Sequence, residues 1–209
     1  MTTLSETQKR LLATIFERGA ESAATALSSW LGRHVRLAVS DVEQVALEEA
    51  SDLLGPGDEL VGACSMPLAG GLDGQVILVF RQGSELALAD LLLQQPIGTT
   101  TTFGELEHSA ACETTNIVGC AYLNSLAAHL PALGPSGTIV PGPPNFRQEF
   151  AASLLEFALM DQALESDRLL LVDTEFSVEE THLDWTLLFV PGPGSLRALI
   201  DALGDGGGP

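Results

Sequence analysis

The sequence predicts an α/β fold built from two similar halves. Each half begins with a long helical pattern, continues through strand patterns and ends with a short helical pattern. Short motifs follow the same order: Leu78-Val-Phe80 corresponds to Leu187-Leu-Phe189, and Leu-Asp at 72–73 recurs at 183–184. Internal self-similarity of this kind indicates a repeated structural unit. We therefore expect a duplicated helix–strand–strand–helix unit fused into one pseudo-symmetric domain. The alternative is that two similar amphipathic patterns arose by chance.

The first half opens with its clearest helix and strand. Residues 4–31 have helical periodicity and are followed by Gly32, a typical helix stop. Residues 34–45 alternate apolar and polar side chains, as a half-buried strand does. The remaining elements expected in this half are a short helix at 47–54, strands at 59–67 and 74–81 joined through Gly70-Gly71, and a helix capped by Ser84 that runs through Leu93.

The second half repeats this order with a longer connection. The expected elements are a long helix at about 104–130, a Pro/Gly-rich connection at 131–144, a helix at about 147–165, strands at 168–178 and 182–190, and a helix at 194–203. We expect residues 1–203 to form a single domain of two repeats, about 4–95 and 104–203. The glycine-rich residues 204–209 are expected to be a flexible tail.

Composition excludes several classes of function. Hydrophobic residues make up 45% of the chain, which argues against disorder, yet no uncharged apolar run approaches the roughly 20 residues that span a bilayer. The start, MTTLSETQKR, lacks the apolar stretch of a signal peptide, so we expect a cytoplasmic protein. The net charge is −19 and Lys9 is the only lysine, so binding to nucleic acid or to an anionic membrane is not expected.

The cysteines do not suggest a metal site. Cys64, Cys112 and Cys120 form no C-x-x-C pair and have no metal-ligand spacing. We expect them to be buried, small hydrophobic side chains in a reducing compartment.

The most informative segment is a polar stripe on the long helix of the second half. Ser109, Glu113 and Asn116 stand at i, i+4 and i+7, within roughly a 60° arc of one helix face. The opposite side carries the apolar residues Ala110, Ala111, Ile117, Val118, Ala121 and Tyr122. Small polar groups held rigidly toward a partner would explain this stripe. The ordinary alternative is that Glu113 and Asn116 only solvate an exposed helix face.

This segment resembles the CheC/CheX/FliY family of CheY-phosphate phosphatases, and its CheC-type members in particular. The family pattern is an acidic residue or Ser, three residues, Glu, two residues, Asn, and a proline some two dozen residues further on. Ser109, Glu113 and Asn116 fit it without a gap, and Ile117-Val-Gly-Cys-Ala-Tyr122-Leu-Asn-Ser-Leu126 resembles the usual continuation. The distal proline could be Pro141, Pro143 or Pro144, and we favour Pro144.

The first half also resembles this family, but its motif is degenerate. The resemblance rests on Gly19-Ala-Glu-Ser-Ala-Ala-Thr-Ala-Leu-Ser28 and Leu31-Gly-Arg-His-Val35. In this half the motif positions hold Arg10, Thr14 and Glu17, so that site looks lost. The resemblance covers the chain apart from its tail. It implies a duplicated pseudo-symmetric CheC-like fold, with long helices packed on a mainly antiparallel sheet.

The resemblance also implies a reaction and partners. It implies a phosphatase acting on the aspartyl phosphate of a CheY-like response regulator in chemotaxis signalling. Asn116 would orient the attacking water, Glu113 would pair with a receiver lysine, and Ser109 would bind at the rim. The protein would need no cofactor of its own, because the receiver supplies Mg²⁺. The alternative is a non-catalytic adaptor that binds a receiver domain or a CheD-like deamidase, and a flagellar-switch component like FliY ranks last.

Overall fold

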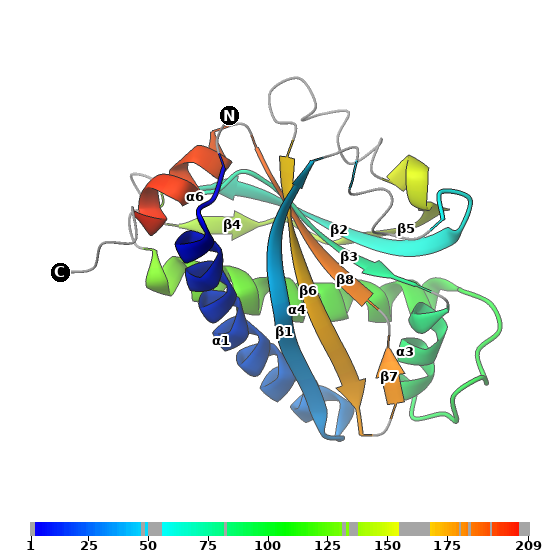
Figure 1. Ribbon diagram of the computed structural model, residues 1–209. Coiled ribbons are helices and arrows are strands. Elements are labelled where there is room, and N and C mark those ends of the chain that lie inside the picture. The colour runs from blue at the N-terminus through cyan, green and yellow to red at the C-terminus, as the bar shows by residue number, and fades with distance from the viewer. Residues whose placement is uncertain are drawn as a thin grey trace.

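The computed structural model describes residues 3–46, 49, 56–81, 83–130, 133, 138–154, 168–179, 181–183, 185–192 and 194–204. Along the chain the elements are α1 (Glu6–Leu31), β1 (Val35–Ala46), β2 (Leu60–Gly70), β3 (Gly74–Phe80), α3 (Ser84–Leu92), α4 (Glu105–His129), β4 (Ile139–Pro141), β5 (Asn145–Phe150), β6 (Arg168–Val178), β7 (Thr181–Leu183), β8 (Trp185–Pro191) and α6 (Ser195–Leu203) (Figure 1).

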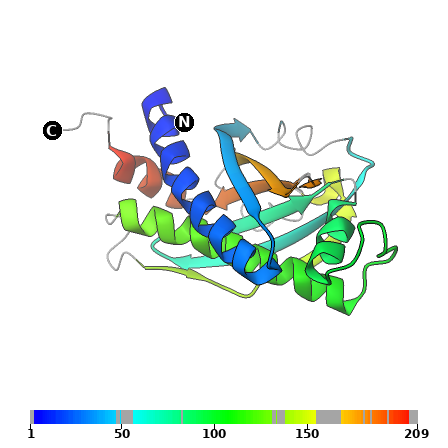
Figure 2. The same ribbon diagram turned by 90° about the horizontal axis from the view of Figure 1, so that it is seen from below.

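The described strands form one antiparallel sheet. Its order is β1-β6-β8-β3-β2-β4, with β5 also pairing with β2 and β7 with β6. The two long helices, α1 and α4, lie on the same side of this sheet and cross each other (Figure 2). The expected α/β fold, with long helices packed on a mainly antiparallel sheet, is confirmed.

The two halves of the chain occupy corresponding places in the sheet. β3 and β8 form its centre, and Leu78 lies directly opposite Leu187. β2 flanks β3, and β6 flanks β8. Each half lends its outer strand to the other half. β1 of the first half pairs with β6 of the second, and β5 of the second half pairs with β2 of the first. This order is what a local two-fold axis between Leu78 and Leu187 would produce. The repeat boundaries at 4–95 and 104–203 stay a prediction.

The two long helices approach closely because one of them carries a glycine at the crossing. A Cβ atom on Gly19 of α1 would lie 2.9 Å from the Tyr122 Cα atom of α4. The Phe16 ring packs on the Tyr122 ring with a centroid distance of 5.5 Å. The Ser125 hydroxyl of α4 donates to the Ile15 carbonyl oxygen of α1 at 2.6 Å. These contacts fix α4, and therefore its polar stripe, against α1.

Both ends of α1 have typical capping residues, and the cap predicted for α3 is wrong. The Ser5 side chain accepts from the Gln8 N–H at the start of α1, and Gly32 ends the helix at φ +66°. Ser84 was expected to cap α3, but it is the first helical residue and Gly83 holds the cap position. The reason is the backbone: Gly83 has φ +75°, a left-handed conformation that favours glycine.

The helix predicted at 147–165 is wrong at its beginning. Residues Asn145–Phe150 form β5, which pairs with β2 from Leu60 to Ser65. The pairing satisfies backbone groups along β2 that an edge strand would leave open. Helical structure begins only at Ala151, and of this helix residues 151–154 are described.

The connection predicted at 131–144 also contains a strand, since β4 pairs with Leu68–Gly70. The Gly70-Gly71 turn between β2 and β3 is confirmed; at Gly70, with φ +97°, a Cβ atom would collide with the Thr138 carbonyl oxygen. The strand predicted at 182–190 is present as β7 and β8. Apart from Glu49, the short helix predicted at 47–54 lies outside the described residues, as does the tail from residue 205.

Candidate functional site

The polar stripe lies on the face of α4 that is turned away from the core. Ser109 and Glu113 are exposed, and Asn116 is half-buried. The buried residues of α4 are Ala111, Thr114, Thr115, Val118, Gly119, Tyr122, Leu123 and Leu126. The structure therefore brings the three predicted side chains together on one packed helix. Such mounting holds a side chain in position better than a loop does.

A proline-rich segment forms the other wall of a groove along this stripe. The groove has a volume of about 430 Å³ and is lined by Ser109, Cys112, Glu113, Asn116, Pro141, Gly142, Pro143 and Pro144. The three prolines considered for the distal position of the motif all line it. Thus a segment some 25 residues downstream returns to the helix that carries the motif.

The proline wall is held in place by β2. The Gly142 N–H donates to the Pro67 carbonyl oxygen at 2.7 Å, and a Cβ atom on Gly142 would lie 2.8 Å from the Pro67 Cγ atom. Immediately after Pro144 the chain enters β5, in which Asn145 pairs with Ser65 and Phe146 with Cys64. The groove therefore has one helical wall and one wall fixed to the sheet.

Cysteine side chains surround the motif, which the sequence analysis did not anticipate. The Cys120 thiol donates to the Asn116 Oδ1 atom, with 3.5 Å between Sγ and Oδ1. Burial raises the pKa of the Cys120 thiol, and the negative charge of Glu113 raises it further, so the thiol keeps the proton that it donates. Cys112 lines the groove, and its Sγ atom lies 3.6 Å from that of Cys64. As expected, Cys64 is buried, but Cys112 and Cys120 are only half-buried.

An aromatic cluster lies beside the helical wall of the groove. Phe103 stacks on Phe146 at a centroid distance of 4.3 Å, and His108 packs on both rings at 5.0 and 4.9 Å. His108 is exposed. Its stacking on Phe146 depends on β5, which forms where the beginning of the helix at about 147–165 was predicted.

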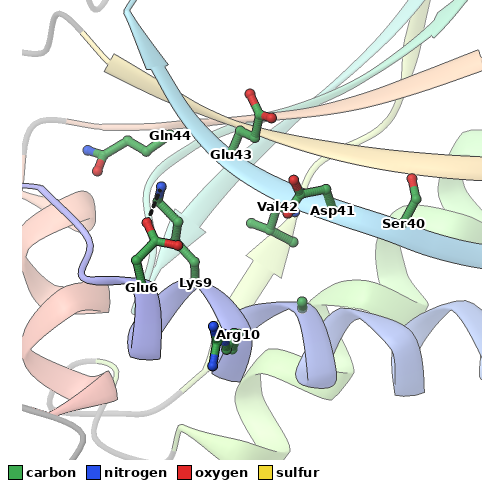
Figure 3. A pocket seen from close by; sticks show the side chains of 9 residues that line it. Glu6, Lys9, Arg10, Ser40, Asp41, Val42, Glu43 and Gln44 are labelled. Atoms are coloured by element: carbon green, nitrogen blue, oxygen red, sulfur yellow. Dashed lines mark hydrogen bonds and ion pairs between the residues drawn. The ribbon is translucent and has the colours of Figure 1, made fainter.

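One position of the degenerate first-half motif, Arg10, lines a depression on α1. This depression of about 370 Å³ is lined by Glu6, Lys9, Arg10, Ala13, Ser40, Asp41, Val42, Glu43 and Gln44 (Figure 3). It includes Arg10 but neither Thr14 nor Glu17, and its second wall is β1 instead of a proline segment. The Thr14 hydroxyl donates to the Arg10 carbonyl oxygen of its own helix at 3.1 Å. Lys9 pairs with Glu6 at 2.8 Å within the depression.

The described residues contain neither a cluster suited to a metal ion nor a helix suited to crossing a membrane. Within that part of the chain, no group of three or more His, Cys, Asp or Glu side chains is arranged to hold a metal ion. None of the described helices is both long and apolar enough to cross a membrane.

The fold of the chain is found in solved structures of FliY, FliM and CheX. No protein-family model matches the chain. Among solved structures, the chain is similar to Thermotoga maritima FliY, with 18% identity, a TM-score of 0.74, and coverage of 98% of this chain and 100% of that one. It is also similar to the FliM middle domain from H. pylori, with 13% identity, a TM-score of 0.67, and coverage of 95% and 99%.

A third similar structure is the CheX–CheY–BeF3–Mg²⁺ complex from Borrelia burgdorferi. The match has 14% identity and a TM-score of 0.50, and it covers 85% of this chain and 97% of that one. The chain thus has the CheC-like fold that FliY, FliM and CheX share, as the sequence resemblance implied.

Proposed function

We propose that this protein hydrolyses the aspartyl phosphate of a CheY-like receiver domain in chemotaxis signalling. The main observation in support is the groove, in which Ser109, Glu113 and Asn116 face the proline wall of residues 141–144. The chain that forms this groove has a CheC-like fold. A structural relative with the same fold, CheX, has been crystallised with CheY, BeF3 and Mg²⁺. Beryllium trifluoride stands in for a phosphoryl group, so that complex represents a phosphorylated receiver.

Positioning is the chemistry that such a groove can supply. Phosphoryl transfer needs a nucleophile in line with the leaving oxygen and stabilised charge on the phosphoryl oxygens. The receiver would contribute the phosphorylated aspartate, the Mg²⁺ ion and a lysine. Asn116 would place the attacking water, because a carboxamide both accepts from and donates to water without bringing a charge to an anionic centre. The water oxygen then bonds to phosphorus, the bond to the aspartyl oxygen breaks, and a free carboxylate and inorganic phosphate result.

Cys120 and Glu113 would assist Asn116 in different ways. The bond from the Cys120 thiol occupies one lone pair of Oδ1 and restricts rotation of the carboxamide. Glu113 is exposed one turn before Asn116, where its carboxylate can meet a cation of the docking partner. Ser109, a further turn back, would bind at the rim of the groove.

A second candidate is a non-catalytic adaptor. The observation that favours it is the similarity to FliM middle domains, one of which was crystallised in a FliG–FliM complex. The groove is flanked by exposed apolar side chains suited to protein contact: Leu106 is 58% exposed on α4 and Val140 is 52% exposed on β4. In this role the chain would bind a receiver domain, or a CheD-like deamidase, without hydrolysis.

The two functions can be separated by measuring binding and turnover together. Purified CheY-like receivers from the same genome would be phosphorylated with a small phosphodonor and Mg²⁺, and the decay of phosphoreceiver followed with and without this protein. Faster decay supports the phosphatase. Binding to the receiver with unchanged decay supports the adaptor and contradicts the phosphatase.

A further inference from the structure

The three cysteines of the chain lie around the turn of α4 that carries Asn116. Cys112 stands four residues before Asn116, and Cys120 stands four residues after it. Cys64, from β2, lies against Cys112 with 3.6 Å between the two Sγ atoms. All three are free thiols in the structure.

The Cys64–Cys112 pair has one accessible member and one protected member. Cys112 is half-buried and lines the groove, so a small oxidant can reach its sulfur. Cys64 has no exposed surface. Burial raises the pKa of the Cys64 thiol to about 12, so this thiol stays protonated and is unreactive toward oxidants in solution. Oxidation would therefore begin at Cys112.

The two thiols belong to the two elements that support the walls of the groove, Cys112 to α4 and Cys64 to β2. Cys112 is part of the helical wall, one residue before Glu113. Cys64 lies opposite Phe146 in the β2–β5 pair, and Phe146 is two residues beyond Pro144 of the proline wall. A covalent bond between Cys64 and Cys112 would consequently tie the helix that carries the motif to the sheet that holds the prolines.

We propose that Cys64 and Cys112 are a modification site, at which a peroxide forms a reversible disulfide beneath the groove. The Cys112 sulfur attacks one peroxide oxygen, the O–O bond breaks, and a sulfenic acid and one water form. The Cys64 sulfur then attacks the Cys112 sulfur and displaces hydroxide, which leaves as a second water with the Cys64 proton. Two thiols lose two electrons in total, the peroxide is reduced to two waters, and a thiol reductant reverses the reaction.

Closing this bond must change the groove. A disulfide brings its sulfur atoms to about 2.05 Å, so the 3.6 Å separation must shrink by more than about 1 Å. α4 and β2 pack closely one turn beyond Asn116, where the Met66 methyl group fills the space that a Cβ atom on Gly119 would take. The movement is therefore transmitted to the turn that carries Glu113 and Asn116. We expect the oxidised protein to lose phosphatase activity, a consequence that rests on the proposed function.

The disulfide itself is tested by peptide mapping, which does not depend on activity. The reduced wild-type protein and its Cys64→Ala, Cys112→Ala and Cys120→Ala variants would be treated with hydrogen peroxide, alkylated and digested without reductant. We expect a cross-linked peptide joining residues 64 and 112 in the wild type and in Cys120→Ala, removed by a thiol reductant. Cys64→Ala should instead give a Cys112 sulfenic acid that dimedone traps. Absence of the cross-link, or oxidation mainly at Cys120, would overturn the proposal.

The functional arm compares each variant with its own reduced state. Peroxide should lower dephosphorylation by the wild type at least tenfold, with recovery on reduction, and Cys64→Ala should lose much less. A cross-link that leaves turnover unchanged would contradict the proposal that the disulfide lowers phosphatase activity. If the reduced protein has no phosphatase activity, the proposed function fails, and the cross-linked peptide still supports the modification site.

Discussion

The Oδ1 atom of Asn116 accepts a hydrogen bond from the Cys120 thiol, one helical turn further along α4. The bond joins the carboxamide at the groove to a side chain anchored on the same helix. It leaves the Nδ2 group and the second lone pair of Oδ1 for contacts outside the protein. The contact explains how a side chain with two rotatable bonds can be held for a positioning role.

Removing this bond should weaken turnover without weakening docking. For Cys120→Ala we predict that kcat falls about fivefold, the effect of a hydrogen bond worth ~1 kcal/mol. KM should stay unchanged, and Cys120→Ser should recover most of the loss, because a hydroxyl also donates to Oδ1. Steady-state dephosphorylation kinetics test the prediction. A matching change in KM, or no recovery with serine, would show that Cys120 contributes packing alone.

Glu113 should act mainly through its charge on the partner. We predict that Glu113→Gln raises KM severalfold and flattens the dependence of kcat/KM on salt, because a rim charge controls electrostatic attraction. The matched control is Glu105→Gln, which removes an exposed carboxylate from the first turn of α4 outside the groove. Kinetics between low and physiological salt provide the measurement. Equal effects of the two variants would mean that only the overall acidity of the chain matters.

The first half should not contribute a catalytic site. Glu17 occupies the position of Asn116 in the first copy of the motif, but it does not line the depression on α1. We predict that Glu17→Ala retains the wild-type rate of phosphoreceiver decay. A loss of tenfold or more would show that the second-half groove is not the sole active centre.

Glu85 should make the stability of the protein dependent on pH. Its side chain is 8% exposed and its Oε2 atom is buried without a hydrogen-bond partner. Burial raises the pKa of this carboxyl above its usual 4.5, although a hydrogen bond from Gln148 acts in the opposite direction. The folded chain therefore binds the proton more tightly than the unfolded chain. The contribution of Glu85 to stability is full below about pH 4.5 and is lost as the pH rises through the raised pKa.

Urea unfolding of the wild type and Glu85→Gln at several pH values would measure this effect. We predict that the variant is more stable than the wild type near neutral pH, because it keeps the shape of the side chain without its charge. The stability difference between the two proteins should shrink toward acid. A difference that does not change with pH would mean that the Glu85 carboxyl has no raised pKa.

Much of the fold could be predicted because periodicity and repetition support each other. The correspondence between the segments at Leu78 and Leu187 anticipated two strands that the structure pairs at the centre of the sheet. The prediction was wrong at residues 147–150, where a helix was predicted from the local pattern and the structure has the end of β5. Extending the comparison of the two halves to this segment predicts a strand, because the corresponding segment of the first half is β1. Pairing with β2 overrides local propensity at this position.

The candidate site was predictable in part. The stripe of Ser109, Glu113 and Asn116 follows from helical spacing, and the structure places all three in one groove. The contacts of Cys64 and Cys120 depend on tertiary packing and on a side-chain rotamer, which spacing along one helix does not determine. Likewise, the motif predicted a distal proline at Pro141, Pro143 or Pro144, but the approach of this segment to α4 is set by its pairing with β2.

The central claim is that Asn116 positions the water that attacks a receiver aspartyl phosphate. It is tested most directly by the decay of phosphoreceiver with the wild type, Asn116→Ala and Asn124→Ala, combined with receiver binding by each protein. Asn124 is the matched control, an exposed asparagine on α4 that does not line the groove. We predict that Asn116→Ala loses roughly 100- to 1,000-fold in rate, as removal of one preorganised polar group does, while it still binds the receiver. Asn124→Ala should keep the wild-type rate. A loss of less than threefold in Asn116→Ala, with wild-type turnover present, would contradict the role of Asn116.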